Sequence, residues 1–176
     1  MKKISLDLIK DLRSRSQASI SDCRKALEES KGDMEAAMKF LRKRGLEIAL
    51  SKKSRCAKQG RVECYVHQGN KLGVIVEVNS ETDFVARNEE FCQFTKDLAM
   101  QIAASCPIYI AREDVPKGTI DKGEDKEEFY KRHCLLEQAF IKDPSINISD
   151  YLNALIGKIG ENIVVRRFTR YKIGEE

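Results

Sequence analysis

The sequence predicts an α+β fold: an N-terminal three-helix domain similar to a ubiquitin-associated domain, followed by an antiparallel sheet packed with helices. Three observations carry this prediction. Apolar residues recur at helical spacing through residues 1–45. Two strand-like runs then flank a turn-forming cluster at residues 68–71. Beyond them, Phe91, Phe94 and Leu98 begin an apolar stripe with the period of an α-helix.

Helix-capping residues divide the first domain, residues 1–45, into three helices. Ser19 or Ser21 can cap the second helix, because a serine hydroxyl accepts a hydrogen bond from a free backbone N–H group at a helix start. Asp33 can cap the third helix in the same way. Gly45 lies where the third helix is expected to end, since a left-handed residue is favoured just past a helix. None of these residues indicates catalytic chemistry.

A basic linker helix, residues 46–59, is expected between the two domains. The basic run spans residues 42–58 and contains Arg42, Lys43, Arg44, Lys52, Lys53, Arg55 and Lys58. Such a run can contact phosphates of a nucleic acid. It can equally be the solvated face of a helix, and this interpretation is favoured because the run holds no aromatic residue on which a base could stack.

The second domain, residues 60–176, is expected to begin with a β-hairpin. Val62, Cys64 and Val66 alternate with polar residues, as in a strand that buries one face. The partner strand is the apolar run at residues 72–78.

A polar segment connects this second strand to the helix that starts after Asn88, and Thr82, Asp83, Phe84 and Val85 lie in its middle. A phenyl ring in a polar connection either folds back onto the core or is presented to a partner. An acid–base role for Asp83 with a neighbouring carboxylate would need a cleft that shifts one pKa. A strand-to-helix corner is a poor cleft, so the sequence predicts a binding protein and not an enzyme.

The last strand is expected at residues 162–173 and carries Arg166, Arg167 and Arg170. These arginines could bind phosphate, or they could protect an exposed sheet edge from pairing with other chains. The second interpretation is favoured for a strand at the border of the sheet.

Composition limits the remaining function classes. The chain has 176 residues, of which 41% are hydrophobic and 34% charged, and its net charge of +4 is too small to indicate a nucleic-acid-binding field. Six cysteines form no Cys-x-x-Cys pair and only two histidines are present, so no metal or cofactor site is predicted. Reduced thiols are expected. No apolar stretch approaches the length of a membrane span, and the N-terminal residues resemble no targeting signal, which favours a cytoplasmic protein.

Three separated motifs give the chain a resemblance to the translation elongation factor Ts family. Residues 77–91 (EVNSETDFVARNEEF) closely resemble the family signature. Residues 12–27 with Gly32 and residues 41–45 resemble its N-terminal segment, and residues 159–168 resemble its closing strand. Residues 16–20 (SQASI) lack the two glycines of the usual turn, and the chain has one hairpin-and-helix unit where long members have two.

The resemblance implies a guanine nucleotide exchange factor for elongation factor Tu, which would be bound in its GDP-bound and nucleotide-free states. It implies that the N-terminal domain docks on the nucleotide domain of that GTPase, with Leu12 and Arg13 near the contact. It implies that Thr82, Asp83 and Phe84, with Val85, wedge between helices of the same domain and dislodge its magnesium ion. No covalent step, cofactor or metal of the chain itself is implied.

Three other hypotheses remain beside this one. A ubiquitin-associated-like binding module without exchange activity would keep the N-terminal domain and lose the role of the tip. A basic RNA-associated protein would act through residues 42–58. A homodimer that pairs through its sheets is a hypothesis about assembly, and it is compatible with exchange activity.

Overall fold

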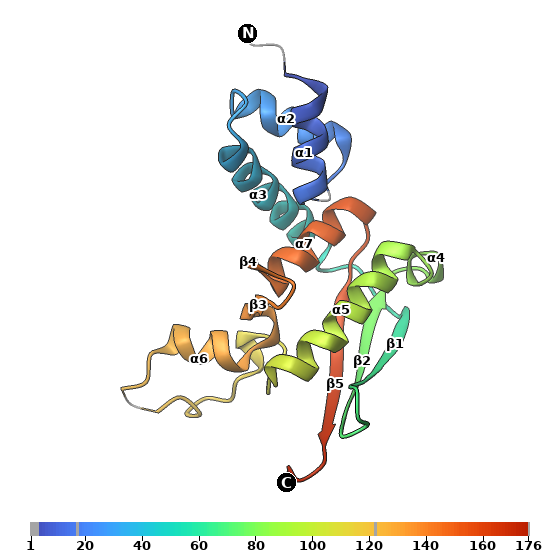
Figure 1. The fold of residues 1–176 in the computed structure, drawn as a ribbon, viewed down its shortest axis with the longest axis vertical. Coiled ribbons are helices and arrows are strands. Elements are labelled where there is room, and N and C mark those ends of the chain that lie inside the picture. The colour runs from blue at the N-terminus through green and yellow to red at the C-terminus, as the bar shows by residue number, and fades with distance from the viewer. Residues whose placement is uncertain (1–3, 17, 122, 176) are drawn as a thin grey trace. The chain divides into compact units, whose positions relative to one another are not determined.

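A computed structural model describes residues 4–16, 18–121 and 123–175 and confirms the α+β fold (Figure 1). The chain packs as two compact units, and each unit is built from two segments. The first unit contains Met1–Cys56 and Asp150–Asn162, and the second contains Ala57–Ser149 and Ile163–Glu176. The domain boundaries expected at residues 45 and 59 remain a prediction.

The first unit is a helical bundle of α1 (Leu6–Ser16), α2 (Ile20–Glu29), α3 (Met34–Lys52) and most of α7 (Ile148–Ile159). The expected caps are present: the Ser19 hydroxyl accepts from the Asp22 N–H at 3.1 Å, and Asp33 accepts from the Ala36 N–H at 2.9 Å. A buried cluster fills the space between the first three helices and comprises Ile9, Leu12, Cys23, Ala26, Leu27, Ala37 and Leu41.

The expectation that the third helix ends at Gly45 is wrong, because α3 continues to Lys52 and buries Gly45 in its interior. A Cβ atom at Gly45 would lie 3.3 Å from the carbonyl oxygen of Asn153 in α7. The glycine is therefore explained by the close approach of two helix backbones and not by a helix end. Asn162, beyond α7, donates to the Arg55 carbonyl at 2.8 Å and fastens the same two segments.

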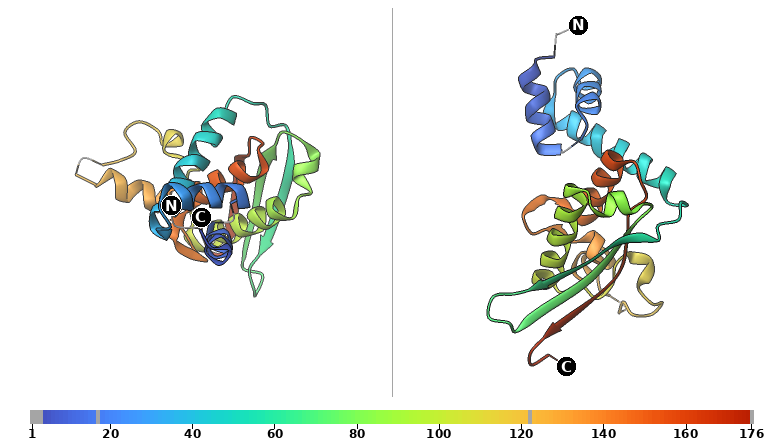
Figure 2. Two further views of the ribbon diagram at one scale, coloured as in Figure 1. Left: turned by 90° about the horizontal axis from the view of Figure 1, so that it is seen from above. Right: turned by 90° about the vertical axis from the view of Figure 1, so that its right-hand side faces the viewer.

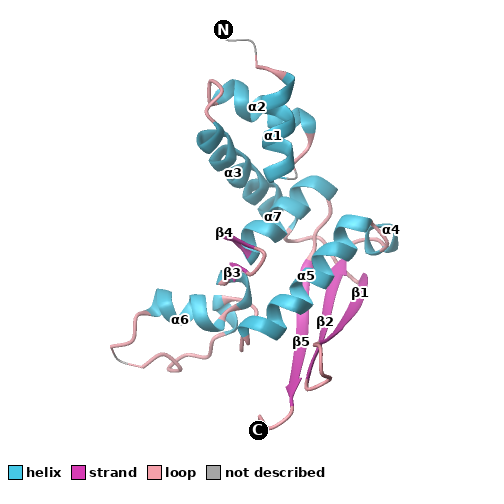
Figure 3. Cartoon of the chain, viewed as in Figure 1, coloured by secondary structure: helices cyan, strands magenta, loops and turns pink. Residues whose placement is uncertain are grey.

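The second unit is built on an antiparallel sheet in the order β1-β2-β5, and Figure 3 shows its strands in magenta. Its strands are β1 (Gln59–Val66), β2 (Leu72–Ser80) and β5 (Val164–Lys172). The β1–β2 hairpin is seen in full in the right-hand view of Figure 2. Helix α5 (Glu89–Ser105) packs on β1 and β2 and buries the predicted apolar stripe of Phe91, Phe94, Leu98 and Ile102.

The face of β1 that the sequence analysis expected to be buried points outward. Val62 and Val66 are 61% and 62% exposed, and Cys64 is also exposed. The inner face of β1 carries Arg61 and Glu63, which pair in register with the buried Val78 and Val76. Their opposite charges neutralise each other across a 2.8 Å ion pair, which is how a strand can turn charged side chains inward.

Strand β5 lies at an edge of the sheet, as predicted, and two of its arginines are paired with acids. Arg167 contacts Glu77 at 2.7 Å, and Arg170 forms an ion pair with Glu175. The Arg167 hydrogen bond lowers the pKa of the Glu77 carboxyl. These contacts favour the edge-protecting role of the arginines over phosphate binding.

The segment between α5 and α7 consists of short helices and strands joined by loops. These are η1 (Arg112–Asp114), α6 (Lys126–His133), η2 (Leu135–Glu137), β3 (Ala139–Phe140) and β4 (Asp143–Asn147). Arg112 bonds Glu127 and Glu137 at 2.7 and 2.6 Å and lies over the Tyr130 ring, so one guanidinium joins three of these elements. Buried Gln101 of α5 fastens β3 through bonds to the Ala139 carbonyl and the Ile141 N–H.

Candidate partner-binding site

The Phe84 side chain extends into solvent from a one-turn helix, α4 (Asp83–Ala86), between β2 and α5. It is 80% exposed, the largest exposed fraction among the large hydrophobic residues in the described part of the chain. Of the two fates that the sequence left open for this ring, burial in the chain's own core is excluded. The ring is exposed at the surface, and Phe84 belongs to α4, the short helix whose backbone is labelled in Figure 1.

Helix α4 contains no fully buried residue, although Val85 and Ala86 are half-buried, and polar contacts help to hold its position. Thr82 caps its start by accepting from the Val85 N–H at 3.5 Å. The hydroxyl of Ser80, a fully buried residue at the end of β2, donates to the Thr82 carbonyl at 2.8 Å. The tip is thereby tied to the central strand of the sheet. Ser80 was not among the predicted site residues, because a serine at a strand end gives no distinctive signal.

The Asp83 carboxylate accepts from the Arg87 guanidinium at 2.8 Å, one helical turn further on. The Asp83 side chain is 49% exposed and that of Arg87 is 78% exposed, so this is a surface ion pair that water screens. Arg87 was not among the predicted site residues. The i, i+4 spacing of Asp83 and Arg87 was the signal that could have identified the pair.

Asn88 starts α5 immediately after the tip, as predicted. Its side-chain oxygen accepts from the Glu90 and Phe91 N–H groups at 2.8 and 3.3 Å. Glu89 and Glu90 lie in the first turn of α5, where negative charge is favoured by the helix dipole. The tip is thus followed directly by a well-capped helix.

The two residues predicted to dock the N-terminal domain have different surroundings. Arg13 is exposed on α1. Leu12 is fully buried in the bundle core and offers no surface of its own to a partner in this structure. Leu12 could therefore affect docking only indirectly, by packing in the core that fixes the shape of the helical bundle. Leu12 and Arg13 belong to the first unit and the tip belongs to the second.

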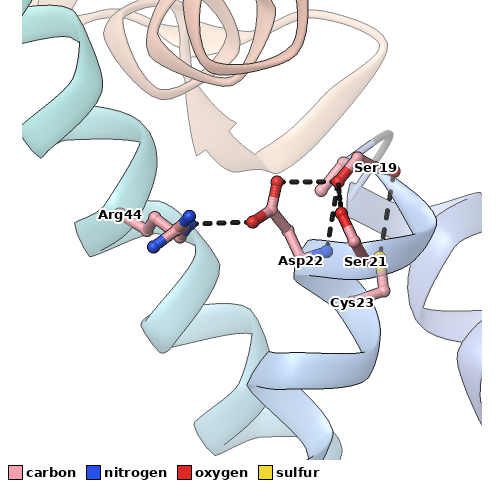
Figure 4. Close-up of polar contacts among 6 residues, drawn as sticks. Ser19, Ser21, Asp22, Cys23 and Arg44 are labelled. Atoms are coloured by element: carbon pink, nitrogen blue, oxygen red, sulfur yellow. Dashed lines mark hydrogen bonds and ion pairs between the residues drawn. The ribbon is translucent and has the colours of Figure 1, made fainter.

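The turn that lacks the family's glycines leads into the start of α2, which Figure 4 shows. The Ser19 hydroxyl contacts one carboxylate oxygen of Asp22 at 2.7 Å, while Arg44 of α3 contacts the other at 2.8 Å. Residue 17 of the turn lies outside the described residues. Burial raises the pKa of the neighbouring Cys23 thiol.

The residues that the structure describes contain no group of three or more histidine, cysteine or acidic side chains arranged to hold a metal ion. No helix in the same residues is long and apolar enough to cross a membrane.

The fold and the site define a class: an α+β protein in which a short exposed helix joins the central strand of a sheet to the helix that covers it. The family model described as Elongation factor TS matches residues 2–127. The chain therefore belongs to the elongation factor Ts family.

Proteins named Elongation factor Ts are similar to the chain over almost its whole length. The one from Thermoanaerobacter sp. (strain X514) is 47% identical, and the alignment covers 98% of this chain and 96% of the relative. The one from Carboxydothermus hydrogenoformans is also 47% identical, with 98% and 90% covered. The one from Methylacidiphilum infernorum is 45% identical, with 98% and 96% covered.

Proposed function

We propose that this chain is a guanine nucleotide exchange factor for elongation factor Tu and acts in translation elongation in the cytoplasm. It binds the GDP-bound GTPase, promotes GDP release and remains bound to the nucleotide-free form until GTP enters. The observation that carries the proposal is the exposed Phe84 on α4, inside the segment that resembles the family signature. Membership of the elongation factor Ts family supports it.

The tip acts as a wedge between helices of the partner's nucleotide domain. A GTPase holds its nucleotide through phosphate contacts and through a magnesium ion that bridges phosphate oxygens. Phe84 supplies the volume that separates the helices, and Asp83 supplies a carboxylate that competes for groups in the magnesium and phosphate network. Thr82 and Val85 complete the tip, since Thr82 caps α4 on the Val85 N–H. No covalent bond forms or breaks.

The free energy available from the ring sets the scale of the effect. Burying a phenylalanine side chain contributes about 1.5–3 kcal/mol. Each tenfold change in nucleotide affinity requires about 1.4 kcal/mol. The tip alone therefore weakens GDP binding by roughly one to two orders of magnitude. The coupling is reciprocal, so bound GDP weakens the binding of this chain by the same factor.

Docking surfaces outside the tip supply the rest of the affinity. The N-terminal helices, an arrangement similar to a ubiquitin-associated domain, bind the nucleotide domain through a surface that includes Arg13, and Leu12 holds the shape of that surface. The C-terminal part of the core binds a second domain of the same partner. No direct nucleic-acid contact is proposed: in the basic run, Arg44 is paired with Asp22 at 2.8 Å and Arg42 lies 4.0 Å from Asp150.

Two copies of the chain pair through the outer face of their sheets. This face carries exposed apolar side chains, among them Val62 at 61%, Ile75 at 48% and Tyr171 at 70% exposure. Burial of such side chains is favourable, and contiguous apolar patches of this kind mark interaction sites. Light scattering tests the proposal: a mass close to that of one 20.1 kDa chain at micromolar concentration contradicts it.

The decisive experiment measures the release of fluorescently labelled GDP from elongation factor Tu in the presence of catalytic amounts of this chain. We expect GDP release to be accelerated, with each molecule of factor acting on many GTPase molecules in succession. No acceleration, together with capture of ubiquitin in a pull-down, would indicate a ubiquitin-associated-like module. RNA binding whose affinity falls steeply with salt would indicate an RNA-associated protein.

A further inference from the structure

A chain of polar contacts runs from the inner face of β1 to the end of the exposed tip helix. The Arg61 guanidinium donates from Nε to Glu63 at 2.8 Å and from Nη1 to the Cys92 sulfur at 3.4 Å. The Cys92 thiol in turn donates to the carbonyl oxygen of Ala86, the last residue of α4, at 3.6 Å. Four residues thus connect strand β1, helix α5 and the tip helix.

This series of polar contacts is anchored in the interior of the second unit. The Glu63 side chain is only 13% exposed, and the hydroxyl of fully buried Thr95 also donates to it at 3.2 Å. The Glu63 hydrogen bond raises the pKa of the Arg61 guanidinium. The Arg61–Glu63 pair therefore has little freedom to move. Its hydrogen bond to the Cys92 sulfur holds that thiol in one orientation.

The other end of α4 is held by the bond from the Ser80 hydroxyl to the Thr82 carbonyl. Val85 and Ala86 of α4 are half-buried, so packing also contributes to the position of this helix. The carbonyl groups of Thr82 and Ala86 are two points at which buried or half-buried side chains from outside α4 hold the helix that carries Phe84.

We infer that Arg61 and Cys92 are positioning residues for the Phe84 tip: they hold the C-terminal end of α4 in the orientation in which the ring can enter the partner. This inference rests on the proposed exchange function. Loss of the contact lets α4 populate other orientations, and a partner binds the competent fraction only. A hydrogen bond of this kind changes such a population on the order of 2- to 10-fold.

The primary test compares Cys92→Ala with Cys92→Ser in the GDP-release assay, at factor concentrations well below saturation and at a temperature well below unfolding. Cys92→Ala is expected to slow release about 2- to 10-fold, and Cys92→Ser to restore most of the rate because a hydroxyl can also donate to the Ala86 carbonyl. Cys56→Ala is the matched control, since Cys56 is exposed and lies outside the second unit. An unchanged rate for Cys92→Ala overturns the inference.

A double-mutant cycle separates positioning from a general loss of structure. If Cys92 acts through the Phe84 ring, Cys92→Ala does not slow GDP release any further when Phe84 has already been replaced by alanine. Fold-changes that multiply in the double variant overturn the inference, because they show that Cys92 acts independently of Phe84.

Hydrogen exchange of residues 83–88 gives a readout that needs no partner. Cys92→Ala is expected to accelerate exchange of the backbone amides of Ala86, Arg87 and Asn88 about 2- to 10-fold, while the α5 amides keep their protection. Should the wild-type chain fail to release GDP, the proposed function fails but this measurement still decides the positioning role. Unchanged exchange in this segment contradicts that role.

Discussion

Gly45 of α3 and Gly157 of α7 lie against each other, and a Cβ atom placed on Gly157 would be 3.5 Å from the Gly45 Cα atom. The two residues are far apart in the sequence, yet both belong to the first unit. Helix backbones approach this closely only where side chains are absent. The pair explains a glycine in the middle of a 19-residue helix, where glycine is otherwise unfavourable.

The first prediction concerns this helix contact. Gly45→Leu is expected to lower the free energy of unfolding by about 2 kcal/mol, because the larger side chain meets the Asn153 carbonyl and forces the helices apart. Chemical denaturation followed by circular dichroism measures the change. Lys43→Leu, at an exposed position of the same helix, is the control and should change the value by less than about 0.5 kcal/mol. Equal effects of the two variants would show that the contact is unimportant.

The second prediction concerns Phe84. Phe84→Ala is expected to leave the unfolding temperature unchanged, because the ring contacts mainly solvent, and to slow GDP release far more than it weakens docking. Stopped-flow release of labelled GDP and a binding titration give the two quantities. Ile108→Ala removes another exposed apolar side chain, 59% exposed, and should change neither. Equal losses of release and docking would reduce Phe84 to a simple contact.

The third prediction separates the two members of the tip ion pair. Asp83→Asn is expected to lower the exchange rate without unfolding the protein, since the pair is exposed and contributes less than about 1 kcal/mol to stability. Arg87→Met leaves the carboxylate in place and frees it, so exchange should be retained or increased. Thermal melts verify the folding of both variants. A normal exchange rate for Asp83→Asn would remove this carboxylate from the mechanism.

The fourth prediction concerns the fully buried Gln101, whose amide bonds the Ala139 carbonyl at 3.1 Å and the Ile141 N–H at 2.9 Å. Gln101→Leu removes both contacts from buried surroundings and is expected to cost about 2–4 kcal/mol of stability. Denaturant unfolding measures the cost. Gln68→Leu makes the same chemical change at an exposed turn position and should be close to neutral. A neutral Gln101→Leu variant would mean that water replaces the lost contacts.

The fifth prediction concerns thiol reactivity. Burial raises the pKa values of the Cys23 and Cys134 thiols, so less of each is in the nucleophilic thiolate form near neutral pH. Both are expected to be alkylated more slowly than the exposed Cys56 and Cys106, and the rates at Cys23 and Cys134 should rise as alkaline pH increases their thiolate fractions. Mass spectrometry of peptides after timed iodoacetamide treatment measures each rate. Rapid labelling of Cys23 in the folded protein would contradict the buried core of the first unit.

Features set by short-range chemistry were predictable from the sequence. The caps at Ser19, Asp33 and Asn88 depend on residues within one helical turn. The apolar stripe that begins at Phe91 and the turn at residues 68–71 are equally local patterns. The α+β class follows from the order of these elements along the chain.

Features set by distant segments were not predictable. Arg61 on the inner face of β1 has a partner, Cys92, that lies 31 residues away in the sequence. The burial of Gly45 follows from α7, more than 100 residues further along the chain. A local reading assigns valine to the interior and glycine to a helix end, and it has no means of detecting these partners.

The candidate site was predictable as a segment but not as a structure. The sequence placed Phe84 in a strand-to-helix connection and left its direction open. Exposure of the ring depends on α4, whose two ends are held by Ser80 and Cys92. Neither Ser80 nor Cys92 belongs to a sequence pattern that would predict this role.

The interleaving of the two units along the chain has a consequence for proteolysis and for fragment design. The backbone passes between the units three times, after Cys56, after Ser149 and after Asn162. A protease that cuts at one crossing leaves two covalent tethers, so a single nick does not set either unit free. A fragment that stops at Cys56 would lack α7, so the surface of α3 around Gly45 that α7 covers in the intact chain would be exposed.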